Sequence, residues 1–128
     1  MSRASAYAVF RNSDKFAGFA LLDTADTPAE RRKGLMGVRR LNPLCGMLFT
    51  SLEPSGSFWM KNCLMDLDVM FIDGDGTVSK VYTMKADDGE KRYPYAGEAK
   101  AIEMEAGFCR SHGIVPGTSV SVKEVRNV

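Results

Sequence analysis

The sequence predicts a mainly β (α+β) fold, an antiparallel β-sandwich or small barrel with one helix in the N-terminal half and one short helix near the C-terminus. Eight short runs of apolar and β-branched residues, separated by turn residues, indicate the strands. One clear helix-start signal and one short glycine-bounded run indicate the helices. The chain has 128 residues, of which 45% are hydrophobic and 26% are charged. We therefore expect residues 1–128 to form a single domain.

The predicted strands are short and spread along the whole chain. They cover Tyr7–Phe10, Ala17–Leu22, Met47–Thr50, Ser57–Met60, Asp68–Asp73, Thr77–Met84, Lys100–Glu105 and Ser119–Val125. The Asp-Gly-Asp-Gly turn at Asp73–Gly76 is the strongest hairpin signal, because glycine accepts the positive φ of tight turns. It predicts that Val69–Ile72 pairs with Val78–Tyr82. Near-alternation around Val120 and Val122 predicts a half-buried strand that closes the sheet.

Two helices interrupt the strands. Thr27–Glu30 supplies a hydroxyl at the N-cap, proline at the first helical position and glutamate three residues after the cap, which together form a capping box. We expect this helix to end at about Gly37, which can adopt the left-handed conformation that terminates helices, and to bury Leu35 and Met36. A single-turn helix is predicted over Gly107–His112.

The charge balance excludes several classes of partner. Seventeen basic and sixteen acidic side chains give a net charge of +1, so no strong field attracts nucleic acid or an anionic membrane. No stretch approaches the roughly 20 apolar residues that span a bilayer. We therefore expect no sequence-specific nucleic-acid binding and no membrane span. The predicted partner is a small molecule or a protein of unknown identity, and the predicted state is a monomer or weak dimer.

Cysteine usage indicates the cellular compartment. Cys45, Cys63 and Cys109 are an odd number at wide spacings, which favours free thiols in a reducing compartment. The first residues contain no apolar run of signal-peptide length, so the predicted localisation is cytoplasmic. Cys109 and His112 could join the other two cysteines around zinc, but the tight ligand pairs of zinc motifs are missing. We predict no metal and no cofactor.

A run around the only tryptophan is the first candidate site. Because side chains alternate along a strand, Trp59 and Lys61 are expected to share one face, while Phe58, Met60 and Asn62 share the other. An aromatic floor beside a cation suits a flat or anionic ligand. The structural alternative is that Trp59 belongs to the core and Lys61 extends from it toward water. The sequence leaves both readings open.

Three further charged positions are candidates for the same site. Asp68 precedes an apolar strand, where it either pairs with Lys61 or caps a nearby turn. Arg31 belongs to a locally basic segment that extends to Arg40 and could meet a phosphate or an acidic partner, or simply form a solvated helix face. Glu103 lies in a predicted strand and is a candidate general acid or base.

Several short blocks together resemble a known family. They are Glu30-Arg31, Gly34-Leu35-Met36, Leu41, Gly46-Met47-Leu48-Phe49, Phe58-Trp59-Met60-Lys61-Asn62, Leu67-Asp68, Phe71-Ile72-Asp73, Ile102-Glu103 with Gly107, and Gly113-Ile114 with Gly117. In order and spacing they resemble the family called domain of unknown function 192 over about residues 24–120. The resemblance implies a β-sandwich or barrel-like fold, often carried behind a signal peptide or lipoprotein anchor, and no established activity comes with it.

The resemblance also bears on single positions. It places Glu103 at the family's customary glutamate. Cys63 stands where the family usually has threonine, which implies that this thiol is not a shared catalytic residue. Asp66 stands where the family usually has proline, so the turn that orients Lys61 and Asn62 lacks that rigid residue.

Three functional hypotheses follow. The first is a non-catalytic binding module that uses a surface lined by Trp59, Lys61 and Asn62, with Arg31, Asp68 and Glu103 as further ligand-binding candidates. The second is a small hydrolase-like enzyme in which Lys61, Glu103 and Asp68 perform acid–base chemistry. The third is a structural component of a larger assembly that makes contact through the basic segment. No catalytic residue is assigned by the sequence.

Overall fold

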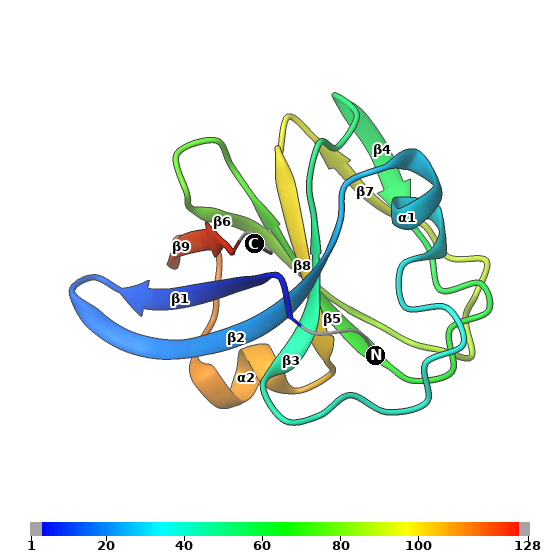
Figure 1. Ribbon diagram of the computed structural model, residues 1–128, viewed down its shortest axis with the longest axis horizontal. Helices are drawn as coiled ribbons and strands as arrows, with labels where there is room; N and C mark the ends of the chain where they lie inside the picture. Colours follow the sequence, from blue (N-terminus) through cyan, green and yellow to red (C-terminus); the bar gives the residue numbers. More distant parts are fainter. Residues whose placement is uncertain (1–3, 126–128) are drawn as a thin grey trace.

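The computed structural model describes residues 4–125 and contains one large and one small β-sheet (Figure 1). The large sheet has seven strands in the order β6-β5-β8-β3-β2-β1-β9, and the small sheet pairs β4 with β7. The elements are β1 (Ala6–Asn12), β2 (Lys15–Ala25), α1 (Pro28–Lys33), β3 (Cys45–Phe49), β4 (Ser55–Phe58), β5 (Leu67–Ile72), β6 (Val78–Met84), β7 (Tyr93–Ala96), β8 (Lys100–Glu105), α2 (Phe108–His112) and β9 (Ser119–Glu124).

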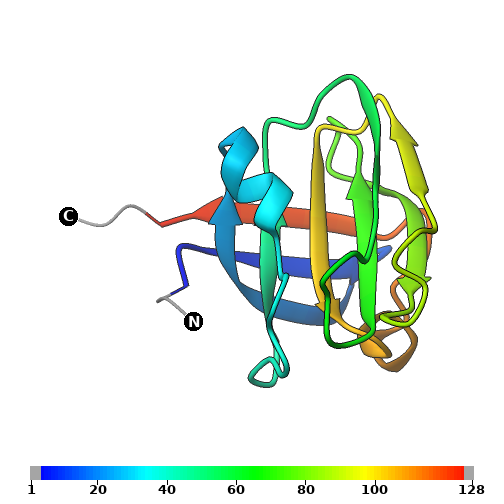
Figure 2. The same ribbon diagram turned by 90° about the vertical axis from the view of Figure 1, so that its right-hand side faces the viewer.

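The prediction of a mainly β fold with two short helices is confirmed, but its strand pairing needs two corrections. First, the large sheet is mixed, because β2 and β3 are parallel while its other pairs are antiparallel. Parallel neighbours require a crossover, and the segment that carries α1 provides it. Second, the sheet does not close into a barrel. The sheet curls, so that β9 (red) runs crosswise to β8 in Figure 2. Its edge strands β6 and β9 form no ladder with each other, and one isolated bridge links Thr77 to Ser119.

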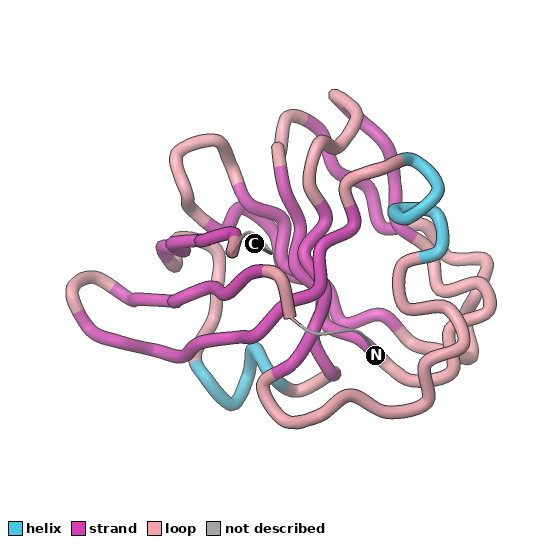
Figure 3. The backbone as a smooth tube through the Cα atoms, in the orientation of Figure 1, coloured by secondary structure: helices cyan, strands magenta, loops and turns pink. Residues whose placement is uncertain are grey.

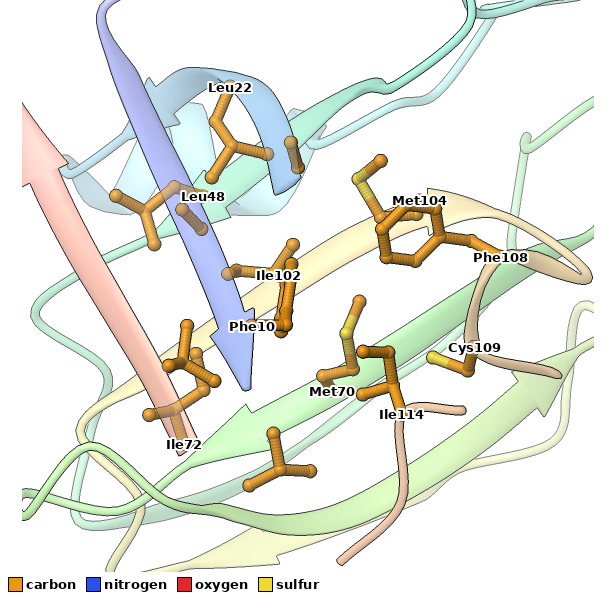
Figure 4. Packing of buried hydrophobic residues seen from close by; sticks show 14 of the residues in the cluster. Phe10, Leu22, Leu48, Met70, Ile72, Ile102, Met104, Phe108, Cys109 and Ile114 are labelled. Atoms are coloured by element: carbon orange, nitrogen blue, oxygen red, sulfur yellow. The ribbon is translucent and has the colours of Figure 1, made fainter. Parts of the chain in front are cut away.

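The large sheet is covered on both faces at β5, where all six residues are buried. Met70 and Ile72 point into a first core with Phe10, Leu22 and the residues around α2 (Figure 4). Their neighbours Leu67, Val69 and Phe71 point to the other face and join a second core. The alternation along β5 thus divides the interior into two cores.

The small sheet and the long loops cover the second core. Phe71 from β5 stacks on Tyr95 from β7 with ring centroids 5.3 Å apart. Phe58 from β4 meets Phe49, Phe71 and Tyr95 edge-on at 5.0, 5.2 and 6.0 Å. Figure 3 shows that most long loops gather on the same side of the molecule as α1. This side holds the candidate site.

Helix α1 begins where the capping box predicts. Thr27 accepts a hydrogen bond from the Glu30 N–H at 3.1 Å, and Glu30 accepts one from the Thr27 N–H at 3.1 Å. The predicted end at Gly37 is wrong by about one turn, because the helix stops at Gly34, whose φ is +47°. Irregular turns continue from there to Gly37. Leu35 is buried in these turns, so the prediction of its burial is confirmed outside the helix itself.

Candidate functional site

A cleft of about 240 Å³ opens between α1 and the small sheet, and Glu103 lies in its lining. Its rim is basic, with Arg31, Arg32 and Lys33 from α1. Its walls are apolar and aromatic, and they comprise Leu35, Met36, Phe49, Leu52, Phe58, Trp59 and Tyr95, together with Ser57 and Cys63. We call this cavity the Glu103 cleft.

Glu103 sits in the middle of the large sheet. On β8 it is opposite Met47 of β3 on one side and Val69 of β5 on the other. Glu103 is 5% exposed, and its carboxyl has no ion-pair partner within residues 4–125. Burial raises the pKa of this carboxyl to about 8, because removal from water penalises the charged form. Glu103 is therefore largely protonated at neutral pH and can donate a hydrogen bond.

Arg31 is held at the rim by the backbone. Its Nη1 donates hydrogen bonds to the carbonyl oxygens of Asp26 at 2.9 Å and Thr50 at 3.2 Å. These two carbonyls follow the parallel strands β2 and β3, so the guanidinium ties the start of the crossover to the end of β3. This anchoring fixes a cation at the mouth of the Glu103 cleft.

Trp59 lines the cleft and carries two cations over its ring. The guanidinium of Arg92 lies 3.9 Å from the ring centroid, and the Nζ of Lys61 lies 5.1 Å away. Both distances are within the range of cation–π attraction. Trp59 is only half-buried, so it is part of the cleft rather than of the inner core.

Lys61 and Asn62 lie outside the cleft lining. The predicted strand Ser57–Met60 is displaced, because β4 ends at Phe58 and the following residues turn. Asn62 has a φ of +62°, a left-handed conformation that asparagine tolerates better than most residues. Its carbonyl accepts a hydrogen bond from the Gly37 N–H at 3.0 Å, which joins two loops beside the cleft. Lys61 is thus not positioned by strand alternation and does not line the Glu103 cleft, although its Nζ lies beside the Trp59 ring as expected.

Asp68 is separated from Glu103 by the sheet itself. It is opposite Met104 in the register of β5 and β8, one position away from Glu103, so the two side chains leave opposite faces. Its carboxylate accepts hydrogen bonds from the Thr83 hydroxyl at 2.7 Å and from the N–H groups of Gly107 at 3.1 Å and Cys109 at 3.0 Å. Of the two roles left open by the sequence, Asp68 takes the cap, at the start of α2.

The thiol of Cys63 faces the same cleft as Glu103. Burial, with a contribution from the charge of Glu103, raises the pKa of this thiol to about 11. A thiol with such a pKa is protonated at neutral pH and is a weak nucleophile.

Part of the cleft was not identified from the sequence. Tyr95 lies on β7, a strand that the sequence analysis did not predict because Pro94 interrupts the run. The available signal was alternation, since Tyr93 and Tyr95 are buried while Pro94 is exposed, and proline is tolerated on an edge strand. Arg92, which covers Trp59, offered no comparable signal.

Residues 4–125 contain neither a metal-binding cluster nor a membrane-spanning helix. In the described part of the chain, no three His, Cys, Asp or Glu side chains gather closely enough to hold a metal ion. His112 is used locally, where its Nδ1 lies 2.9 Å from the Phe108 carbonyl oxygen. None of the helices within residues 4–125 has the length and apolar character needed to cross a bilayer.

Three solved structures are similar to this chain. One from Sinorhizobium meliloti 1021, described as a "putative transcription regulator", has 27% identity and a TM-score of 0.87, and the match covers 95% of this chain and 96% of that one. A protein of unknown function from Novosphingobium aromaticivorans DSM 12444 has 28% identity and a TM-score of 0.81, with 90% and 83% covered. A hypothetical protein from Synechocystis, at 14% identity and a TM-score of 0.53, shares the fold over 93% of this chain but 19% of its own.

Comparison with protein families gives the assignment. No curated protein matches the chain. The model of the DUF192 family, described as "Uncharacterized ACR", matches residues 10–122. This range extends from the end of β1 into β9, and it contains the whole Glu103 cleft. The chain therefore belongs to the DUF192 family.

Proposed function

We propose that this domain is a non-catalytic binding module whose Glu103 cleft takes a small, flat organic carboxylate. The observation that carries the proposal is the position of Glu103, a buried residue that lines a cleft with a basic rim and has no ion-pair partner within the described residues. A buried carboxyl without an ion-pair partner lowers stability. A purely structural role would not favour such a group in the centre of a sheet.

The chemistry of the lining selects the ligand class. A protonated Glu103 can donate a hydrogen bond to a ligand oxygen, while the Arg31 guanidinium balances the ligand's negative charge. The rings of Phe58 and Trp59 favour a flat apolar group. A volume of about 240 Å³ lies below the usual range for drug-sized ligands, so the ligand is small.

The only tryptophan of the chain lines the cleft, so its fluorescence can test the proposal directly. Benzoate serves as the probe, and benzamide serves as the neutral molecule of the same shape. We expect benzoate to change the Trp59 emission with saturation and to raise the melting temperature, and benzamide to bind more weakly. No saturable change with benzoate, or an equal response to benzamide, would contradict the proposal.

Matched variants locate the binding. Arg31→Gln is expected to weaken benzoate binding about 10-fold or more, in line with the loss of a charge-assisted contact. Arg39→Gln makes the same chemical change outside the cleft lining and should leave binding intact. Lys61→Ala should also have little effect, because Lys61 does not line the cleft. Binding that survives Arg31→Gln unchanged would place the ligand elsewhere.

The acid–base enzyme hypothesis receives less support. It requires Lys61, Glu103 and Asp68 in one site, whereas they lie in three different surroundings. Asp68 is engaged at the start of α2 on the opposite face, and Lys61 is exposed beside Trp59. Glu103 alone remains in the cleft, where the proposed binding role uses it.

The description of the Sinorhizobium relative does not add a second candidate function for this chain. The helices of the described residues contain six and five residues. Such helices span about 9 Å or less, which is too short for a recognition helix lying in a major groove. The net charge of +1 also offers little attraction to phosphates.

A further inference from the structure

Asp23 has a side-chain oxygen that is buried without a hydrogen-bond partner in the described part of the chain. Asp23 lies on β2 opposite Met47 of the parallel strand β3. It is 7% exposed, and its Oδ1 has no hydrogen-bond partner within residues 4–125. A buried carboxylate oxygen that has lost its water without gaining a donor costs stability. A ligand that supplies a donor would remove this cost.

Asp23 also lines a cavity. A pocket of about 580 Å³ lies between strands β2 and β3 and the turns after α1, and Asp23 is part of its lining. We call it the Asp23 pocket. Its walls include the apolar side chains of Leu35, Val38 and Met47. Lys33, Leu35 and Met36 also line the Glu103 cleft, so the two cavities are neighbours.

The other charged groups of the pocket are engaged or exposed. The Oε1 of Glu30 accepts the N–H groups of Asp26 and Thr27 in the capping box. Lys33 and Arg40 are exposed, and neither forms an ion pair with Asp23. A ligand in this pocket would therefore meet an Asp23 carboxylate that no neighbouring cation has paired.

We propose that the Asp23 pocket binds the protonated amino group of a small aliphatic amine. The ammonium supplies the donor and the positive charge that the Asp23 carboxylate lacks. The alkyl chain lies against Leu35, Val38 and Met47, which bury apolar area without competing for hydrogen bonds. This site is separate from the proposed function, because it takes a cation where the Glu103 cleft takes an anion.

The lining of the Asp23 pocket does not suit a metal cation, the other simple ligand of a carboxylate. Calcium requires six to eight oxygen ligands and magnesium an octahedron of oxygens. Apart from Asp23, the acidic side chain in this lining is Glu30, which the capping box occupies. An alkylammonium ion needs one carboxylate and an apolar surface, and the pocket offers both.

Chemical-shift titration with n-butylamine hydrochloride at neutral pH tests the proposal on the whole chain, with n-butanol as the uncharged probe of similar length. We expect saturable shifts in the amides of Asp23, Leu35 and Met47 with the amine and weaker ones with the alcohol. Asp23→Asn keeps the shape and should weaken amine binding about 10-fold to 100-fold, as for the loss of a charged hydrogen-bond partner. Asp14→Asn, the same change at an exposed turn, should leave binding intact.

Stability gives a second readout that does not need a ligand. If Asp23 is unpartnered in solution, Asp23→Asn should leave the melting temperature unchanged or raise it. A fall in melting temperature together with no amine binding would mean that a neighbouring cation such as Arg40 already satisfies Asp23, which would overturn the proposal. A lysine-containing peptide, titrated in parallel, shows whether the pocket also accepts the ammonium group of a protein side chain or only that of a free amine. Loss of benzoate binding would not affect either result, because that probe reports the Glu103 cleft.

Discussion

At the scale of single residues, the protonation of Glu103 makes the proposed binding depend on pH. The pKa of its carboxyl is about 8 in the folded chain, against the ordinary value of 4.5. Between these values the folded state holds a proton that the unfolded state has released, so folding stability falls as the pH rises from about 4.5 to about 8. Benzoate binding should weaken above pH 8 for the same reason, since the ionised carboxyl no longer donates.

Glu103→Gln tests both effects. Glutamine can donate a hydrogen bond at any pH, so the variant should retain benzoate binding above pH 8 and lose the decline in stability between pH 5 and 8. Above pH 8 we expect it to be more stable than the parent by about 1–3 kcal/mol, because the parent then buries an ionised carboxylate, whereas the glutamine amide carries no charge. Urea unfolding at intervals of pH measures this difference. Parallel pH profiles for the two proteins would show that Glu103 does not titrate in this range.

Asp68 makes a structural contribution of a different kind. Its carboxylate accepts two N–H groups at the start of α2 and a hydroxyl from β6. Asp68→Asn retains the shape but removes the charge from these hydrogen bonds, so we expect a loss of about 1.5–3 kcal/mol in the free energy of unfolding. Asp73→Asn, at an exposed turn, should change it little. Equal stability of the two variants would contradict the capping role.

At the scale of the element, α1 carries the basic rim while it buries none of its own residues. Its geometry therefore depends on the capping box more than on packing. Thr27→Ala should lower the free energy of unfolding by about 1 kcal/mol and weaken benzoate binding, because Arg31 belongs to the same helix. Thr27→Ser keeps a hydroxyl and should restore both. Unfolding by urea and Trp59 fluorescence measure the two effects.

Elements with strong local signals were predictable from the sequence. The start of α1 and the β5–β6 hairpin depend on residues next to each other in the chain, in the capping box and in the Asp73–Gly76 turn. The parallel pairing of β2 with β3 was not predictable, because it depends on where a long crossover places β3. Strand β7 was missed because Pro94 masks an alternation that is visible in the burial of Tyr93 and Tyr95.

The candidate site was predictable only in part, for the same reason. Trp59, Arg31 and Glu103 were singled out by residue type and do line one cleft. Lys61, Asn62 and Asp68 were grouped with them by their position in the chain. Lys61 and Asn62 lie outside the cleft because β4 ends two residues earlier than predicted. Asp68 is separated because its register places it on the opposite face of the sheet from Glu103. Such differences of one or two residues are decided by tertiary packing, which leaves little trace in local sequence.

At the scale of the whole molecule, one hydrogen-bond network holds the two edges of the large sheet near each other. The buried Thr118 donates to the Asn12 side chain at 2.6 Å and accepts the Val115 N–H at 3.0 Å. Backbone bonds next to it join the edges, from the Val78 N–H to the Thr118 carbonyl at 2.8 Å and from the Val120 N–H to the Gly76 carbonyl at 2.7 Å. These hydrogen bonds thus connect the two edges of the open sheet at one end.

Thr118→Val tests this connection. The change keeps the volume but leaves the Asn12 oxygen and the Val115 N–H without their partner, so we expect a loss of about 1–3 kcal/mol in the free energy of unfolding. Hydrogen exchange should accelerate at the amides of Val78 and Val120, while amides in β5 remain protected. Thr118→Ser should preserve the protection. Uniform acceleration across the sheet would instead indicate global destabilisation.

The neighbours of β1 have a consequence for synthesis of the chain. This strand lies between β2, which follows it directly, and β9, which is translated more than 100 residues later. While the ribosome is still extending the polypeptide, the side of β1 that will receive β9 has free backbone donors and acceptors, and such edges readily recruit other chains. Nascent or prematurely terminated copies that lack β9 are therefore the form of this protein most exposed to aggregation.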